Sequence, residues 1–203
     1  AMDVMVDEAT EDITKMAAMS PSEKSYFETS VFAHAKHRIA WLLILMFSAT
    51  ITGTIITRYE NAFAAIPLLV SFIPMLMDTG GNCGSQSSTL IIRGIALGEI
   101  QFSDLFRVMF KEFRVSLIVG VALALANGIR ILIMYKNAGL ALVIGLSLVA
   151  TIVISKLIGC VLPLIAKKLH MDPAIMASPL ITTLVDTCSI LIYFNIATQV
   201  FQL

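Results

Sequence analysis

The chain has 203 residues, of which 58% are hydrophobic and 14% are charged, and its formal net charge at pH 7 is zero. Soluble domains typically carry about 25% charged residues, so this composition excludes an ordinary soluble protein, and the balanced charge gives no support for nucleic-acid binding. Several apolar stretches reach the ~17–25 residues that span a bilayer. The sequence therefore predicts an all-α, polytopic membrane protein.

Residues 1–36 are polar and predict a cytosolic segment. Glu8, Glu11 and Asp12 would share one face if this part is helical. Crowded carboxylates repel each other unless a cation bridges them, so these residues are candidates for sensing an intracellular divalent ion. A solvated acidic face is an equally good interpretation. The Ser-Pro-Ser-Glu stretch over residues 20–23 is typical of a helix start and predicts an amphipathic surface helix near residues 22–35.

Residues 37–203 are expected to form a membrane domain of five spans. We place these at about residues 39–57, 62–77, 115–135, 138–166 and 173–201, with a polar connection over 99–114. Pro67 and Pro74 argue against a straight second span. The glycine-rich stretch 78–86 follows it and is expected to be non-helical backbone. At membrane depth such backbone is tolerated only where it is buried in protein or lines a watery cavity, so the stretch is expected to line a solvated path.

The basic residues near the loops predict the orientation of the chain. Ten fall on one side, namely Lys15, Lys24, Lys36, Arg38, Arg93, Arg107, Lys111, Arg114, Lys167 and Lys168. The other side carries three, namely Arg58, Arg130 and Lys136. This bias predicts a multi-pass protein of the cell (inner) membrane, with its amino end in the cytoplasm and its carboxy end outside.

The fifth predicted span contains Asp186, the strongest candidate for a functional residue. Asp172 and Pro173 form a good N-cap and first position for this helix. The fourteen residues from Asp172 to Asp186 would place the carboxylate about 21 Å along a helix, well inside a hydrocarbon core of ~30 Å. A charge at that depth is by default a functional-site hypothesis.

Polar side chains accompany Asp186 at steps of three and four residues, on one face of a helix. They are Ser178, Thr182, Ser189 and Tyr193. Such a stripe fits the wall of a pore, or a helix contact whose polar groups bond across the bundle. The aspartate favours the pore.

The candidate ligands are all oxygens, because the glycine-rich stretch adds Asp78, Asn82 and Gln86. Oxygen-only sites suit hard cations, and Mg²⁺ in particular keeps several waters and needs only one or two carboxylates. Two chains around a shared axis would supply two copies of Asp186, so we infer a homodimer. Lys156, inside the fourth span, either pairs with Asp78 or snorkels, and the sequence does not decide which.

Two motifs resemble the signatures of the MgtE family of magnesium channels. One is residues 74–86, with its Gly-Gly-Asn-x-Gly-Ser-Gln core, and the other is the pattern Asp172-Pro-Ala-x₃-Ser-Pro-x₆-Asp186. Residues 7–13 resemble the end of that family's cytosolic part. The resemblance implies a homodimeric five-span pore that conducts Mg²⁺ down its electrochemical gradient. It implies that Asp186 of both subunits holds a hydrated Mg²⁺, with the backbone of Thr182 contributing one turn earlier.

The resemblance also implies regulation by cytosolic Mg²⁺. The ion would favour the closed state by binding Asp172, Glu8, Glu11 and Asp12, and the helix near residues 22–35 would plug the cytoplasmic mouth. Family members usually carry a large amino-terminal regulatory part, which this sequence lacks, so we expect a membrane domain alone with impaired gating. Asp78, Asn82, Gln86, Ser178 and Ser189 are expected to line or support the pore.

Three other functions remain as alternatives. A less selective path for Mn²⁺, Co²⁺ or Ni²⁺ would be separated by competition flux, and a proton-coupled carrier predicts flux driven by a pH gradient. An intramembrane enzyme using Asp78 and Asp186 lacks a nucleophile and base in sensible register. We therefore expect a transport protein and not an enzyme.

Overall fold

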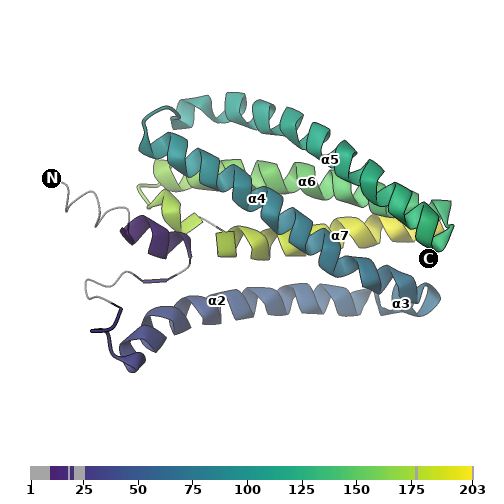
Figure 1. The fold of residues 1–203 in the computed structure, drawn as a ribbon, viewed down its shortest axis with the longest axis horizontal. Helices are drawn as coiled ribbons and strands as arrows, with labels where there is room; N and C mark the ends of the chain where they lie inside the picture. The colour runs from purple at the N-terminus through teal and green to yellow at the C-terminus, as the bar shows by residue number, and fades with distance from the viewer. Residues whose placement is uncertain (1–9, 18, 21–25, 177, 203) are drawn as a thin grey trace.

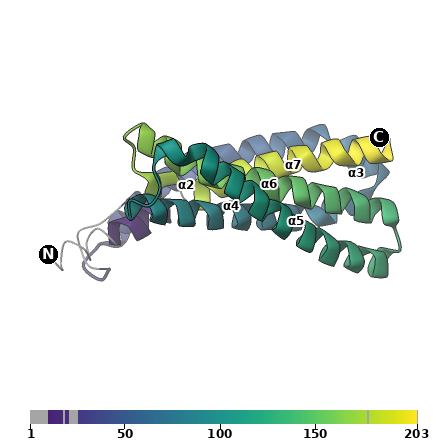
Figure 2. The ribbon, with the colours of Figure 1, turned by 90° about the horizontal axis from the view of Figure 1, so that it is seen from above.

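The computed structural model describes residues 10–17, 19–20, 26–176 and 178–202. These residues form an elongated bundle whose long helices run lengthwise (Figures 1 and 2). The helical segment 10–16 and the carboxy terminus lie at opposite ends of the bundle (Figure 1). The described part of the chain contains no strand, which confirms the all-α class.

The first long helix, α2 (Val31–Arg58), is one continuous element. Its N-cap is Ser30, whose hydroxyl accepts a hydrogen bond from the Ala33 N–H at 3.3 Å and so satisfies a donor that the first turn leaves free. Residues 31–35, which the sequence assigned to a separate surface helix, therefore belong to the same helix as the first predicted span. Residues 22–25 of that predicted helix lie outside the described part, and residues 26–30 are turns and irregular backbone, so the prediction of a helix there is wrong.

Helix α2 packs mainly against α7 (Ser178–Phe201), the last helix of the chain. Their contact includes a 2.8 Å hydrogen bond between the Thr52 and Thr187 hydroxyls and a stack of Tyr59 on Phe194 with ring centroids 4.7 Å apart. Many apolar side chains along α2 are exposed, among them Leu42, Ile44 and Phe47.

The bounds predicted for the second span, residues 62–77, are wrong. The chain there forms the short helix α3 (Glu60–Ala65), the 3-10 helix η1 (Pro67–Phe72) and then the long helix α4 (Ile73–Ala96). Both prolines stand at the start of an element, where the N–H that proline lacks would have no helical partner anyway. They begin helices and do not break one.

The next two long helices form an antiparallel hairpin. They are α5 (Leu105–Tyr135), preceded by the 3-10 turn η2 (Phe102–Asp104), and α6 (Ala138–Lys168). Lys136 takes a left-handed conformation in the turn, and the Asn137 side chain caps α6 by accepting from the Leu140 N–H at 3.0 Å. The predicted third and fourth spans are confirmed, although the polar stretch before Val115 is already part of α5.

The glycine-rich stretch 78–86 is helical throughout, which corrects the prediction of broken backbone. Its glycines let α4 lie close to both α6 and α7. A Cβ at Gly80 would stand 2.8 Å from side-chain atoms of Thr151 and Val185, and one at Gly84 would stand 2.7 Å from Ile181. Because side chains are excluded there, small residues serve close helix packing, and the helix keeps its backbone hydrogen bonds.

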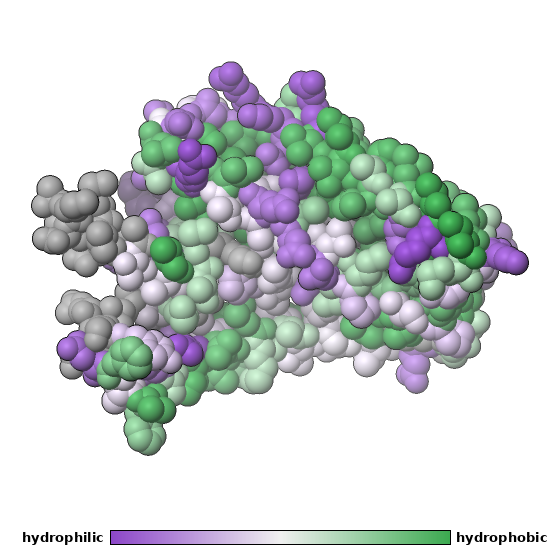
Figure 3. Space-filling model, viewed as in Figure 1, coloured by the Kyte–Doolittle hydropathy of each residue, from purple (hydrophilic) through white to green (hydrophobic). Residues whose placement is uncertain are grey.

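Among the described residues, four helical stretches are long and apolar enough to cross a membrane, namely Val31–Arg58, Phe102–Tyr135, Ala138–Lys168 and Pro173–Phe201. Helix α4 has 24 residues, about 36 Å at ~1.5 Å per residue, but it is more polar. Apolar side chains cover much of the surface over α2 and α5, and a hydrophilic band crosses the face over α4 (Figure 3). An exposed apolar surface of this extent fits lipid, and the chain is a polytopic membrane protein.

Candidate ion site

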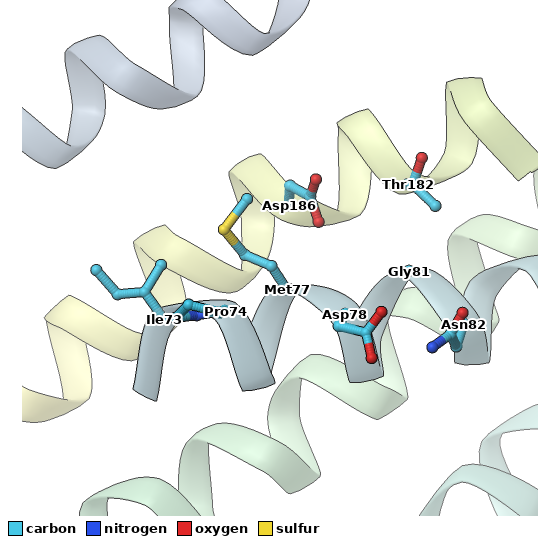
Figure 4. A pocket seen from close by; sticks show the side chains of 8 residues that line it. All are labelled: Ile73, Pro74, Met77, Asp78, Gly81, Asn82, Thr182 and Asp186. Carbon is cyan, nitrogen blue, oxygen red and sulfur yellow. The ribbon is translucent and has the colours of Figure 1, made fainter. Parts of the chain in front are cut away.

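An open pocket of about 420 Å³ lies between α4 and α7. Its lining residues are Ile73, Pro74, Met77, Asp78, Gly81, Asn82, Thr182 and Asp186 (Figure 4). The carboxyl groups of Asp78 and Asp186 therefore share one cavity with the side chains of Asn82 and Thr182. The structure brings these four candidate residues together from two helices that are about 100 residues apart in the sequence.

Asp186 lies eight residues into α7, about 12 Å along the helix at ~1.5 Å per residue. The predicted 21 Å assumed one helix from Pro173 onward, whereas the 3-10 turn η3 (Pro173–Met176) ends before α7 begins. The predicted cap is confirmed on that turn, because the Asp172 carboxylate accepts a hydrogen bond from the Ala174 N–H at 2.9 Å. A position 12 Å from the helix start still falls within a core of ~30 Å.

The α7 wall of the pocket depends on a glycine of α4. A Cβ at Gly81 would stand 2.9 Å from the Thr182 side chain, so only glycine lets the two helices come this close without displacing that side chain. The Thr182 hydroxyl donates to the Pro179 carbonyl at 2.9 Å, which fixes its rotamer beside the cavity. Close packing of α4 on α7 thus sets the width of the oxygen-lined space.

The exposed face of α4 is polar. Asp78, Asn82 and Gln86 follow one another at four-residue steps and are all exposed, whereas Gly80 and Gly84 on the packed side are buried. Gln86 shares this face but does not line the pocket. Polar groups facing hydrocarbon would cost free energy, so this face requires water or another protein surface opposite it.

Comparison with known proteins identifies the family of the segment that builds the pocket. A family profile with the description "MgtE: Divalent cation transporter" matches residues 73–196, which is more than half of the chain and contains every lining residue. The chain belongs to the MgtE family. It is 39% identical over 197 residues to the magnesium transporter MgtE of Bacillus subtilis (strain 168) and 36% identical over 197 residues to that of Thermus thermophilus.

A third MgtE relative, the magnesium transporter MgtE of Enterococcus faecalis, is 34% identical over 198 residues. These alignments cover 97–98% of this chain and 43% of each relative. The chain therefore spans less than half the length of the curated MgtE proteins that it matches.

Two members of the polar stripe in this MgtE chain lie away from the pocket. Ser189 is 1% exposed and donates to the Val185 carbonyl at 2.7 Å. Tyr193 is fully buried and donates to the Leu69 carbonyl at 2.8 Å. The Ser189 bond stays within α7, whereas the Tyr193 bond joins α7 to η1, which is the kind of contact that the alternative to the pore describes. The side chain of Ser178 lies outside the described part.

A second polar cluster lies beside the turn between α6 and α7. The Lys15 ammonium group contacts the Glu11 carboxylate at 2.5 Å and the Asp172 carboxylate at 2.6 Å. An ammonium group of the chain itself therefore bridges two of the expected Mg²⁺ ligands. Asp12 has an interaction of its own, and Glu8 lies outside the described residues. The described part of the chain holds no group of three or more His, Cys, Asp or Glu side chains arranged for a metal ion.

The charges in this cluster shift each other's pKa. Burial raises the pKa of Asp172, but hydrogen bonds from Lys15 and the Ala174 N–H, together with the charges of Lys15 and Lys167, outweigh burial and bring this pKa below its ordinary value. The hydrogen bonds to Asp172 and Glu11 raise the pKa of Lys15. Both groups are thus held in their charged forms at neutral pH.

Sequence reasoning missed a buried charge pair in the membrane domain. The ammonium group of Lys156, on α6, lies 3.6 Å from Glu112 on α5, and neither side chain is more than 10% exposed. Glu112 had been assigned to a polar connection. Its spacing was informative, because the buried residues Val108, Glu112, Ser116 and Gly120 recur every four residues on one face of α5.

Proposed function

We propose that this chain forms a channel that conducts Mg²⁺ through a pore lined by α4 and α7. The observation that carries the proposal is the convergence of Asp78 and Asp186 on one pocket at the depth of the membrane-spanning helices. Carboxylates at that depth are rare and belong to ion or proton pathways far more often than to structural contacts. The similarity to proteins named magnesium transporter MgtE gives independent support.

The chemistry of the pocket favours a hydrated divalent ion. Its polar donors are carboxylate, amide and hydroxyl groups, with no histidine or thiolate among the lining residues, and such oxygen donors suit Mg²⁺. Six waters occupy roughly 180 Å³ at their share of liquid volume of ~30 Å³ each. The pocket of about 420 Å³ therefore has room for an ion that keeps its water shell, as Mg²⁺ prefers.

The exposed polar face of α4 supports a homodimer. Asp78, Asn82 and Gln86 are exposed in the single chain. A second copy related by a two-fold axis along the pore would face this wall with an identical one and supply a second Asp186. The two carboxylates would then balance the charge of one Mg²⁺.

We also propose that cytosolic Mg²⁺ favours the closed state through Asp172, Glu11, Asp12 and Glu8. Two contacts support a mechanical link from this region to the pore. Lys15 holds Asp172 at the start of η3, and the Ser88 hydroxyl of α4 donates to the Met176 carbonyl at the end of η3 at 2.9 Å. An ion that repositions Asp172 would therefore act on a turn that is bonded to the pore helix.

The proposed location is the cell membrane, with the amino end in the cytoplasm. The loops between α4 and α5 and between α6 and α7 lie at the same end of the bundle as residues 10–16 (Figure 1). The helix ends that flank these loops carry Arg93, Arg107, Lys111, Arg114, Lys167 and Lys168. This common end supports the orientation derived from the positive-inside rule. No catalytic role is proposed.

Flux through proteoliposomes tests this function. The purified 203-residue chain is reconstituted, and Mg²⁺ entry is followed with a trapped indicator dye under an inward Mg²⁺ gradient. We expect entry without a pH gradient and weak competition by Mn²⁺, Co²⁺ and Ni²⁺. Entry that needs a pH gradient would favour a proton-coupled carrier, and strong competition would favour a less selective channel. A particle mass near that of one 22.0 kDa chain under conducting conditions would contradict the homodimer.

A further inference from the structure

Three buried side chains join α4, α5 and α6 behind the pore wall. The Ser87 hydroxyl of α4 donates to the Glu112 carboxylate at 2.6 Å, and the Lys156 ammonium group donates to the Ser87 hydroxyl at 3.2 Å. Lys156 and Glu112 face each other at 3.6 Å. Ser87 is fully buried, and Lys156 and Glu112 are 5% and 8% exposed. We call these three residues the back triad.

Stability alone does not account for charges at these positions. Replacing a buried ion pair by apolar residues of similar volume is often neutral or stabilising, whereas removing one partner strands the other charge and is strongly destabilising. The pair is thus a weak stabiliser of the fold. Two other effects of the pair concern the pore. It fixes the orientation of α4, and it changes the electrostatic potential along the pore wall.

The back triad is hydrogen-bonded to α4 on the side opposite the pore face. Ser87 follows Asp78 by nine residues, which is 2.5 turns at ~3.6 residues per turn, so the two side chains point in opposite directions from the helix axis. A rotation of α4 that turned Asp78 and Asn82 away from the pocket would pull Ser87 off Glu112. The hydrogen bond therefore fixes the direction of the polar face.

The charge of Lys156 also acts on the pore, because α6 packs directly behind α4. Lys156 puts a positive charge one helix behind the wall along which a divalent cation would pass, and Glu112 neutralises it at 3.6 Å. Charge–charge forces act over longer distances in a low-dielectric interior than in water. Without Glu112, the Lys156 charge would oppose entry of the ion.

We propose that Ser87, Glu112 and Lys156 are positioning residues for cation conduction: they hold the polar face of α4 toward the pore, and Glu112 cancels the charge of Lys156 that would otherwise repel the ion. The inference rests on the proposed channel function. It predicts that the two members of the ion pair respond differently to neutralisation, which a purely structural pair would not do.

The test measures Mg²⁺ entry into proteoliposomes as a function of Mg²⁺ concentration, per amount of monodisperse protein, for Glu112→Gln, Lys156→Met and the double variant. Glu112→Gln leaves an unbalanced cation, so we expect a several-fold higher half-saturating Mg²⁺ concentration. Lys156→Met leaves a carboxylate and is expected to leave that concentration unchanged or lower it, and the double variant is expected to return to the unmodified value. Glu99→Gln, an exposed carboxylate in the loop after α4, is the matched control.

Two further variants keep the test decisive if Glu112→Gln does not fold. Glu112→Asp retains the charge and is expected to preserve the half-saturating concentration. Ser87→Ala retains both charges but removes the hydrogen bond to α4, so the maximal rate should fall while the half-saturating concentration stays unchanged. Equal shifts in both single variants, or an unmodified rate in Ser87→Ala, would overturn the inference while leaving the channel function intact. No Mg²⁺ entry through the unmodified chain would overturn the channel function and the inference with it.

Discussion

The substitution Gly159→Ala tests the close contact between α4 and α6 that shapes the pore wall. A Cβ at Gly159 would fall on the backbone carbonyl of Gly84 in α4. Backbone atoms cannot move aside as a side-chain end can, so the two helices would have to separate. Overpacking of this kind costs ~1–3 kcal/mol, while alanine regains about 0.5–1 kcal/mol of helix propensity over glycine. Because the clash is with backbone, we expect an overpacking cost of about 3 kcal/mol, so the free energy of unfolding should fall by about 2 kcal/mol.

The matched control is Gly145→Ala in the same helix, where the added Cβ would stand 3.8 Å from the Ala124 Cβ, an ordinary van der Waals distance. Only the propensity gain applies there, so the control should be as stable as the unmodified chain or slightly more stable. A change of ~1 kcal/mol shifts the unfolding midpoint by about 2–4 °C in a chain of this size. Gly159→Ala should therefore lower the midpoint by about 4–8 °C.

The assay is thermal unfolding in detergent, followed by circular dichroism and by the monodisperse fraction in size-exclusion chromatography. Mg²⁺ entry into proteoliposomes is measured on the same samples. We expect it to fall for Gly159→Ala, because the added Cβ would push α4 away from α6. Equal midpoints for Gly159→Ala and Gly145→Ala would refute the close packing and favour broken backbone in the glycine-rich stretch.

Two further predictions concern the cluster around Lys15. Lys15→Gln removes the ammonium group that bridges Glu11 and Asp172, so proteases should cleave the segment before α2 faster at low Mg²⁺, and millimolar Mg²⁺ should restore protection; unchanged cleavage in the variant would show that the bridge holds nothing in place. In the unmodified chain the bridge should be insensitive to pH between about pH 5 and pH 9, which lies above the ordinary pKa of aspartate (~3.9) and below that of lysine (~10.4). Because the pKa of Asp172 is lowered and that of Lys15 is raised, protection should decline as the pH falls through the lowered aspartate pKa or rises through the raised lysine pKa. A loss of protection near pH 7 would contradict this assignment.

The long apolar helices could be predicted from the sequence, because each carries its own signal. In α5 and α6 the apolar run exceeds the length of a membrane span, and the turn between them contains a residue suited to cap a helix, Asn137. Helix α4 carried the opposite local signal, since proline and glycine usually interrupt helices. The reason for its glycines lies in α6 and α7, at Thr151, Val185 and Ile181, and a single sequence does not reveal which distant side chains a helix will meet.

The residues of the candidate site could be predicted in part, but the contacts that limit the site could not. Asp186 and Thr182 stood out because a carboxylate with helically spaced hydroxyls is costly in a membrane, and the pocket contains both. The stripe alone could not show where it stops lining a cavity. That limit is set by the packing of Tyr193 against Leu69, a contact 124 residues apart in the chain. The bridge from Lys15 to Asp172 spans 157 residues and was equally invisible to local reasoning.

The most direct test of the central claim is Mg²⁺ entry through Asp186→Asn, compared with the unmodified chain and with Glu99→Gln. Asparagine keeps the size of the side chain and removes its charge, so the fold should persist, with an unfolding midpoint close to that of the unmodified chain. If Asp186 holds the conducted ion, entry should fall to the level of empty vesicles in this variant and remain unmodified in the control. Full Mg²⁺ entry through well-folded Asp186→Asn would contradict the role of this carboxylate and the pore built around it.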